Sequence, residues 1–525
     1  MDLWSDLETY SPTPIANGVH IYAEAAEVLL WAYALGGGPP SVWDLPSRSV
    51  HRYDDLTDGW TEERPKKGIP DDLLRALEDE SVPVWFHNGG MFDFVVLGKA
   101  LPDLLARVDQ TRWRDTLVQA LSHALPGALD KLGAVLNLPE DERKLKDGRR
   151  LVLKFCKPDA KGNRATRETD PDDWMQFVHY AARDILSMRR AHKAMPMWNY
   201  RERDIALWHL DLRTNYRGFA VDLDLADAAI RTAAGVQAGL AMDVQDLTEG
   251  AVGSANQRDA LLAHILDVHG VELPDMRADT LERRLDDPDL PDAVKDLLRI
   301  RLQASMNSVA KFKALRRGVS SDGRLRGCAQ FRGAGRTGRA AHRMFQPGNL
   351  PRPTMSHALT DAAIDALKSG YLDLIVDKPM SAISGTIRGA IVAPLGRKLV
   401  VADLANIEGR VAAWLAGEDW KLQAFRDFDT ILGLDAKGKP IRKGPDLYAV
   451  AYARAFNTTT EVVMENKAHG DGLMRQIGKV MELMLQYEGG VSAFLTGAAT
   501  YGIDLDAMAE AAWPCLLYTS DAADE

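Results

Sequence analysis

The chain has 525 residues, which is too many for one hydrophobic core and predicts three or four domains of about 150 residues each. Its formal net charge of −11 argues against binding a polyanion over the whole surface, although one groove can differ from the average. The three cysteines, Cys156, Cys328 and Cys515, lie far apart without C-x-x-C spacing, which argues against a disulfide framework or a structural zinc site.

The first 195 residues alternate apolar runs with helical patterns. Apolar runs cover residues 20–35, 82–87 and 150–155, and a helical pattern covers residues 174–195. This alternation predicts an α/β domain that the linker at residues 196–204 closes. Residues 1–20 lack a basic start followed by an apolar stretch, and no run reaches the roughly 18 apolar residues of a membrane span. We therefore expect a cytoplasmic protein without a membrane partner.

Acidic residues recur at three places in this domain. Asp6 and Glu8 are two residues apart, so both side chains would lie on one face of a strand. Asp93 follows an apolar strand and a glycine turn, while Tyr180 and Asp184 share one face of a helix. Four such carboxylates could hold two divalent cations about 4 Å apart for in-line attack on a phosphodiester, with Tyr180 orienting the attacking water. Each pattern alone is also common among surface acids.

The three motifs resemble those of proofreading 3′-to-5′ exonucleases, which carry D-x-E, N-x-x-x-F-D and Y-x-x-x-D in this order. Asn88, Phe92 and Asp93 match the middle motif without a gap. The resemblance implies a ribonuclease H-like α/β exonuclease domain over residues 1–195 that acts on single-stranded DNA 3′ ends. The metal ligands it implies are Asp6, Glu8, Asp93 and Asp184.

The middle of the chain is mostly helical and ends in a basic segment. Residues 224–247 and 292–317 have the spacing of amphipathic helices, and the Asp322–Gly323 turn then begins glycine-rich, strand-like sequence. Residues 323–352, the arginine strip, contain no acidic residue and carry Arg324, Arg326, Arg332, Arg336, Arg339, Arg343 and Arg352. Arginine among glycines suits a backbone close to phosphates and groove edges, which predicts a nucleic-acid-binding segment. A solvated loop is the alternative.

An apolar run at residues 397–405 predicts a buried strand that ends near Asp403. Helical spacing with Glu408 and Arg410 near its start follows. A lone carboxylate at the end of a buried strand usually has a metal ion and a second carboxylate beside it. The sequence therefore raises the question of where the second carboxylate lies.

Farther on, a helical stripe carries charge at one end. Its members recur every four residues and are Arg475, Lys479, Leu483 and Tyr487. The basic side chains of Arg475 and Lys479 could hold a triphosphate. Leu483 and Tyr487 would then flank a base pair. A helix with a basic, solvated end is the alternative.

Residues 337–352, 387–410 and 475–490 look like successive landmarks of a family A DNA polymerase of the bacteriophage type, related to bacterial DNA polymerase I. The resemblance implies that Asp403, with the Leu404 carbonyl, binds two catalytic magnesium ions, for which manganese could substitute. It also implies that Glu408 excludes the 2′-hydroxyl of a ribonucleotide. The motif here reads D-L-A-N-I-E-G-R instead of the commoner D-Y-S-Q-I-E-L-R, so its acids and arginine are kept, and Leu404 and Gly409 are among the positions that depart from the family.

The resemblance implies primer–template DNA and dNTPs as partners of a monomeric enzyme in the cytoplasm of a host cell. The nucleotide-holding and catalytic positions it implies on the helical stripe are Arg475, Lys479 and Tyr487. The primer–template would be held by Arg336, Thr337, Arg339, Asn349 and Arg352. The implied domains are the exonuclease (1–195), thumb and linker helices (196–322), and an incomplete α+β palm with helical fingers (323–514).

The second palm motif of the family, essentially His-Asp-Glu on a hairpin after the fingers, is missing downstream of Tyr487. Residues 515–525 resemble translated sequencing-adapter sequence, so we expect a C-terminally truncated chain with a non-native tail. Such a chain would lack the second palm carboxylate, expose apolar surface and lose synthesis, while the exonuclease acids stay complete. Because the first exonuclease motif begins at Asp6, no 5′ nuclease domain is expected.

Two alternatives to a proofreading polymerase stay open. The chain could be only a 3′-to-5′ exonuclease with a vestigial polymerase region, or a non-catalytic module that grips primer–template DNA through the arginine strip. A single-subunit RNA polymerase is a weaker rival, because those enzymes share the palm but lack the proofreading acids and the excluding glutamate.

Overall fold

The computed structural model describes residues 1–54, 59–139, 148–306, 308–351, 355–486, 489–500, 503 and 505. The chain packs as two compact units, Met1–Leu399 and Val400–Glu525. Tyr487, Arg352 and the tail at 515–525 lie outside the described residues. Among the residues that are described, no helix is both long and apolar enough to cross a membrane.

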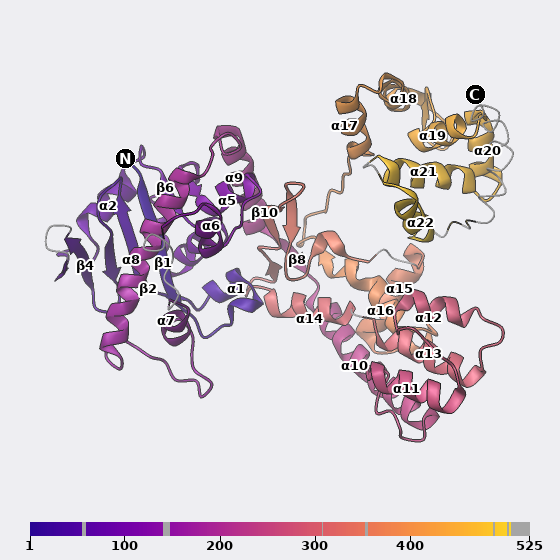
Figure 1. Cartoon of the computed structure of the whole chain (residues 1–525), viewed down its shortest axis with the longest axis horizontal. Coiled ribbons are helices and arrows are strands. Elements are labelled where there is room, and N and C mark those ends of the chain that lie inside the picture. Colours follow the sequence, from indigo (N-terminus) through magenta and orange to yellow (C-terminus); the bar gives the residue numbers. More distant parts are fainter. Residues whose placement is uncertain are drawn as a thin grey trace. The chain divides into compact units, whose positions relative to one another are not determined.

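A seven-stranded mixed sheet forms the N-terminal part of the first unit (Figure 1). Its strands are β1 (Leu3–Tyr10), β2 (Glu27–Leu35), β3 (Ser41–Asp44), β4 (Ser49–Asp54), β5 (Gly59–Glu63), β6 (Val84–Phe86) and β7 (Trp113–Asp115). Their order is β5-β4-β3-β2-β1-β6-β7. β1 is antiparallel to β2 and parallel to β6, and a register shift follows Glu8. The predicted α/β class of this region is confirmed.

Helices pack against the sheet, and its central strand β2 is apolar on both faces. From Val28 to Ala34, no residue of β2 is more than 6% exposed, as expected for a strand between two packed layers. α8 (Pro171–Ala194) packs against β1, β2 and β3, and α3 (Asp93–Ala100) packs against β2. The other helices here are α1 (Val19–Ala23), α2 (Asp71–Glu78), α4 (Pro102–Leu105), α5 (Thr116–Ser122), α6 (Leu129–Val135) and α7 (Gly148–Phe155), with 3-10 turns η1 (Ile15–Asn17), η2 (Gly89–Met91) and η3 (Gln110–Arg112).

The apolar run at residues 150–155 differs from the strand-like runs with which it was grouped. It lies in helix α7 rather than in a strand. Leu151 and Phe155, four residues apart, are buried, whereas Arg150 and Leu153 are exposed. The burial period is therefore helical, and the short run was ambiguous on its apolar content alone.

Helices make up most of the rest of the first unit. They are α9 (Glu202–Arg217), α10 (Leu223–Leu247), α11 (Arg258–His269), α12 (Ala278–Leu285), α13 (Asp292–Ala304), α14 (Ser308–Gly318), α15 (His357–Ser369) and α16 (Pro379–Thr386), with 3-10 turns η5 (Pro347–Asn349), η6 (Leu372–Leu374) and η7 (Ile387–Ala390). α10 packs against α13, α14, α15 and α16. Its buried Ala226, Ala229 and Ala233 let these neighbours approach closely. The predicted helix at 224–247 is confirmed, and the predicted segment at 292–317 forms two helices.

Short strands join distant segments of this unit. β8 (Phe219–Val221) lies between β9 (Arg324–Leu325) and β12 (Ile391–Val392), antiparallel to both. β10 (Ala329–Ala334) and β11 (Arg339–His342) form a separate antiparallel hairpin. The turn of this hairpin needs a left-handed backbone at Gly338, whose φ is 67°, and glycine adopts that conformation without a Cβ penalty.

The second unit is a cluster of helices with one hairpin. It comprises α17 (Ile407–Ala416), α18 (Asp419–Asp429), β13 (Ile431–Leu434), β14 (Pro440–Arg442), α19 (Leu447–Ala455), α20 (Thr460–His469), α21 (Leu473–Leu485) and α22 (Val491–Thr500). α19 and α21 cross closely at Gly478, where an added Cβ would lie 2.1 Å from the Tyr448 carbonyl oxygen. The predicted helices after Asp403 and from Arg475 are confirmed.

The predicted buried strand at residues 397–405 is wrong. These residues form no strand, and Val400 and Val401 are 83% and 90% exposed. No strand among the described residues pairs with this segment. A strand without a hydrogen-bonded neighbour gains no ladder bonds and buries little surface, so its apolar composition alone cannot hold it in a sheet.

Candidate metal centre and nucleic-acid interface

The first exonuclease-like motif lies on β1, an interior strand of the sheet between β2 and β6. Asp6 and Glu8 alternate with Leu7 on β1 and share one face. Asp184 reaches the same place from α8, and one carboxylate oxygen from each of the three residues lies within 4.8 Å of the others. Glu8 and Asp184 are 8% and 4% exposed. The fold thus gathers residues separated by more than 170 positions into one acidic cluster.

Asp93 lies beside this cluster at the start of α3. Its Oδ1 accepts a hydrogen bond of 3.2 Å from the backbone N–H of Leu7, the residue between the two β1 acids. Burial raises the pKa of Asp93 well above its usual range, and the nearby Asp6 and Asp115 carboxylates raise it further. Asp93 therefore faces concentrated negative charge in a buried setting.

The donor set of this cluster fits divalent cations. Carboxylate oxygens are the ligands that Mg²⁺ and Mn²⁺ prefer. A cation bound at the Asp6, Glu8 and Asp184 oxygens would also favour the ionised form of Asp93, whose pKa is now raised by burial and by like charge. The residues present are therefore suited to a metal-dependent reaction.

Tyr180 lies one helical turn before Asp184 on α8 and is 3% exposed. Burial raises the pKa of its phenol, with further contributions from Asp184, Glu8 and Asp6. The hydroxyl stays protonated at neutral pH and can donate a hydrogen bond. Its ring lies against the first residue of α7, Gly148, where an added Cβ would be 2.0 Å from the ring.

A cavity of about 570 Å³ opens beside the acidic cluster, and its lining includes Glu8, Tyr22, Phe92 and Cys156. The Cys156 Sγ lies 3.8 Å from Glu8 Oε2. Burial is the main cause that raises the pKa of this thiol well above its usual range, and the charge of Glu8 raises it further. No site was predicted at the cysteines, because Cys156 lies 148 residues from Glu8 in the chain and no motif links the two.

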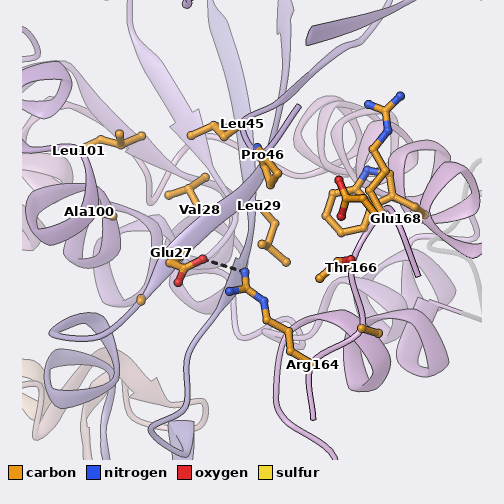
Figure 2. A pocket seen from close by; sticks show the side chains of 14 residues that line it. Glu27, Val28, Leu29, Leu45, Pro46, Ala100, Leu101, Arg164, Thr166 and Glu168 are labelled. Atoms are coloured by element: carbon orange, nitrogen blue, oxygen red, sulfur yellow. Dashed lines mark hydrogen bonds and ion pairs between the residues drawn. The ribbon is translucent and has the colours of Figure 1, made fainter. Parts of the chain in front are cut away.

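A second hollow, of about 520 Å³, contains none of the four acids (Figure 2). It is bordered by the start of β2 and by residues 164–168. Figure 2 shows Arg164 reaching Glu27, with 2.7 Å between guanidinium nitrogen and carboxylate oxygen. Arg167, also in the lining, pairs with Asp44 and Glu62. The arginine charges here are matched by carboxylates, so the hollow does not favour an anion.

The arginine strip divides into structural and outward-facing members. Arg324 donates to the carbonyl oxygens of Arg217 and Gly218, and Arg326 pairs with Asp322. Arg332 pairs with Asp204 at 2.6 Å, and Arg343 donates to Gln330. Arg336, Thr337 and Arg339 are exposed at the β10–β11 turn, and Asn349 is exposed in η5. Fewer arginines of the strip therefore face outward than its composition indicated.

The palm-like motif lies in the second unit. Asp403 is in an exposed, irregular segment, and Glu408 is in the first turn of α17. Arg410 donates to the Ala405 carbonyl oxygen and pairs with both carboxylate oxygens of Asp429. The arginine of this motif thus ties the segment after Asp403 to the end of α18.

The helical stripe lies on α21, and its described members are half-buried. Arg475 pairs with Asp446 at 2.8 Å, and its guanidinium lies 5.2 Å from the centre of the Tyr448 ring. Asp446 also accepts from backbone N–H groups at the start of α19. The Arg475 side chain is therefore held in place by a neighbouring helix.

Two known proteins that resemble this chain are polymerases. The DNA polymerase of Bacillus phage SP02 is 31% identical over 512 residues, which are 95% of this chain and 71% of that polymerase. The polymerase domain of Pol1 from M. smegmatis, solved with DNA primer–template and dNTP, has a TM-score of 0.55 and 16% identity. The match covers 99% of this chain and 72% of that domain, and shows a shared fold. No family model matches the chain. On the identity and coverage of the phage enzyme, this chain belongs to the bacteriophage DNA polymerases.

Proposed function

We propose that this DNA polymerase carries a 3′-to-5′ proofreading exonuclease at the acidic cluster of its first unit. The observation that carries the proposal is the meeting of Asp6, Glu8 and Asp184 beside the interior strand β1, with Asp93 next to them. Strand β1 is antiparallel to β2 on one side and parallel to β6 on the other. This pairing supports a ribonuclease H-like arrangement for residues 1–195.

Each residue of the proposed exonuclease has a distinct task. Asp6, Glu8, Asp93 and Asp184 bind the divalent cations. Two such ions supply activation of water and charge stabilisation during phosphodiester cleavage. The neutral Tyr180 hydroxyl donates to the attacking water and orients it. The cavity beside Glu8 has an apolar side that can receive the terminal nucleotide of a single strand.

For the polymerase half, we propose the roles that the family resemblance implies. Asp403 binds magnesium, Glu408 excludes ribonucleotides, and the stripe of Arg475, Lys479 and Tyr487 holds the incoming dNTP. The exposed Arg336, Thr337 and Arg339, with Asn349 and Arg352, track the primer–template. Residues 196–322 act as thumb and linker, 323–514 as palm and fingers, and 515–525 as a non-native tail.

Within the described part of the chain, the palm-like segment gathers fewer acids than the acidic cluster of the first unit does. Among the described residues, no cluster of three or more possible metal ligands includes Asp403. We propose that the exonuclease is active in this chain and that synthesis is lost, because Asp403 belongs to no such cluster among the described residues.

Primer extension tests both halves of the proposal. The full chain is incubated with a 5′-labelled primer on a longer template and Mg²⁺, with and without dNTPs. We expect the primer to shorten in both conditions and Asp93→Ala to stop the shortening. Asp103→Ala is the matched control, because Asp103 is an exposed acid on α4. No shortening would disprove the exonuclease, and net extension would disprove the loss of synthesis.

A non-catalytic primer–template module is the second candidate, favoured by the exposed residues of the β10–β11 turn. Alanine at both Asp6 and Glu8 separates it from the exonuclease. If cleavage is the function, nuclease activity vanishes while duplex affinity persists.

A further inference from the structure

The turn that delivers Asp93 to the acidic cluster is held at one buried residue, Gly90. The Gly90 N–H donates to Asp115 Oδ2 at 3.2 Å. The Gly90 carbonyl oxygen accepts from the Tyr216 hydroxyl at 2.6 Å. Both backbone groups of this residue are therefore held by side chains from elsewhere in the chain, three positions before Asp93.

Helix α9 packs so closely over Gly90 that no larger side chain fits at this position. An added Cβ there would lie 2.8 Å from the Trp208 ring and 2.9 Å from Leu212. Protein interiors of this density transmit a displacement rather than absorb it. The loss of either hydrogen bond at Gly90 would therefore shift the backbone that leads to Asp93.

Asp115 supports the same turn from β7. It is 1% exposed, and its Oδ1 accepts from the Asn88 N–H and the Leu117 N–H, each at 2.9 Å. Asn88 has a left-handed backbone with φ of 71°. One buried carboxylate thus joins this strained position to the start of α5.

Tyr216 is itself held in place. Its ring packs near those of His20 and Trp113, with centroids 5.4 Å and 6.3 Å away. Its backbone carbonyl oxygen accepts from Arg326 Nε at 2.7 Å. The hydroxyl is therefore a rigid donor rather than a side chain that adapts to the turn.

We propose that Tyr216 is a positioning residue of the exonuclease site. Its hydrogen bond to Gly90 fixes the turn so that Asp93 stays bonded to the Leu7 N–H beside Asp6 and Glu8. The inference rests on the proposed exonuclease function and adds a residue that none of the three acidic motifs contains. Tyr216 also lies after residue 195, so a helix beyond the predicted exonuclease domain supports the metal ligands of that domain.

The test compares the full-length wild type with Tyr216→Phe, which removes only the hydroxyl. Tyr33→Phe is the matched control, because Tyr33 is 1% exposed and its hydroxyl bonds Asp72 at 2.9 Å, away from the acidic cluster. Two quantities are measured for each: Mn²⁺ binding by electron paramagnetic resonance, and exonuclease rate on a 5′-labelled single strand as Mg²⁺ is varied.

We expect Tyr216→Phe to weaken Mn²⁺ binding and to raise the Mg²⁺ concentration for half-maximal rate, each by about tenfold, as for residues that orient metal ligands. High Mg²⁺ should restore most of the rate, and KM for the strand should change less than about twofold, since no strand contact is lost. Tyr33→Phe should match the wild type.

Equal metal dependence in Tyr216→Phe and the wild type would overturn the inference and leave the exonuclease intact. Equal weakening in both tyrosine variants would also overturn it, since any lost buried hydroxyl would then have the same effect. A wild type with neither nuclease activity nor Asp93-dependent Mn²⁺ binding would overturn the proposed function, and the inference with it.

Discussion

At the residue scale, small side chains decide how the acidic cluster is built. Gly148 and Gly90 each occupy a place where a Cβ would collide with a neighbour, Tyr180 in one case and α9 in the other. Neither was singled out from the sequence as important. Their role follows from what packs against them, and that is invisible in a linear motif.

Gly148→Ala should impair cleavage by displacing Tyr180. The added Cβ would lie 2.0 Å from the ring, so the ring or the start of α7 must move. We expect the exonuclease kcat to fall about tenfold or more, because a misplacement of about 1 Å near reacting groups can cost up to about a hundredfold. Gly235→Ala on α10, with no atom within 4 Å, is the control and should leave kcat unchanged. An unchanged kcat in Gly148→Ala would contradict the role of Tyr180.

Asp93 should make the metal-free protein less stable as pH rises. Its pKa is raised in the folded state by burial and by Asp6. The stability linked to its protonation is present below the unfolded pKa and is lost as pH rises through the folded pKa. Asp93→Asn removes this loss and keeps an oxygen to accept from Leu7.

In EDTA, we therefore expect Asp93→Asn to melt at a higher temperature than the wild type at pH 8 and at nearly the same temperature at pH 4. Asp115, whose pKa burial raises to about 6, is present in both proteins. Thermal unfolding followed by circular dichroism measures the difference. An increase of the same size at both pH values would show that Asp93 titrates normally.

At the element scale, the β10–β11 hairpin separates the arginines that build the fold from those that face outward. Arg324, Arg326 and Arg332 bind backbone oxygens or carboxylates of neighbouring segments. Arg336 and Arg339 lie at the exposed turn. Composition alone counted all of them as one basic strip, since charge says nothing about which side chains have internal partners.

Replacing both Arg336 and Arg339 with alanine should weaken primer–template binding through lost phosphate contacts. We expect the slope of log Kd against log salt concentration to fall by about 1.8, at about 0.9 for each contact. Fluorescence anisotropy with a labelled duplex at several salt concentrations measures this slope. Arg299→Ala, on α13 where Arg299 pairs with Asp296, is the control and should leave the slope unchanged. An unchanged slope in the double variant would place the DNA elsewhere.

At the scale of the whole molecule, the two proposed activities use separate parts of the chain. The four exonuclease acids and Tyr180 lie in the first unit, and Asp403, Glu408, Arg475 and Lys479 lie in the second. The resemblance to a phage-type DNA polymerase is confirmed by the phage relative and by the shared fold of Pol1.

Asp403→Ala should therefore leave cleavage of a single strand unchanged within about twofold, because substitutions in separately packed units usually show little coupling. The rate is measured on the 5′-labelled single strand used above, beside Asp93→Ala as the inactive reference. A large fall in Asp403→Ala would show that the exonuclease depends on the palm-like segment.

The family was recognised by the resemblance of whole motifs, whereas the α/β class of the N-terminal part and the helices that carry Tyr180, Asp184 and Arg475 were predictable from residues close in the chain. The class and the helices follow from short-range spacing, because the strand and helix periods place neighbouring residues on one face whatever the rest of the chain does. The order of the three acidic motifs added the expectation of a shared metal site.

Only the tertiary structure decided which partners these elements have. It left residues 397–405 without a strand neighbour, gave Arg326 and Arg332 internal partners, and brought Asp115 and Tyr216 to the backbone of Gly90. Tyr216 is 126 positions from Gly90. Contacts at such separation depend on how whole elements pack, and no local pattern of residues encodes them.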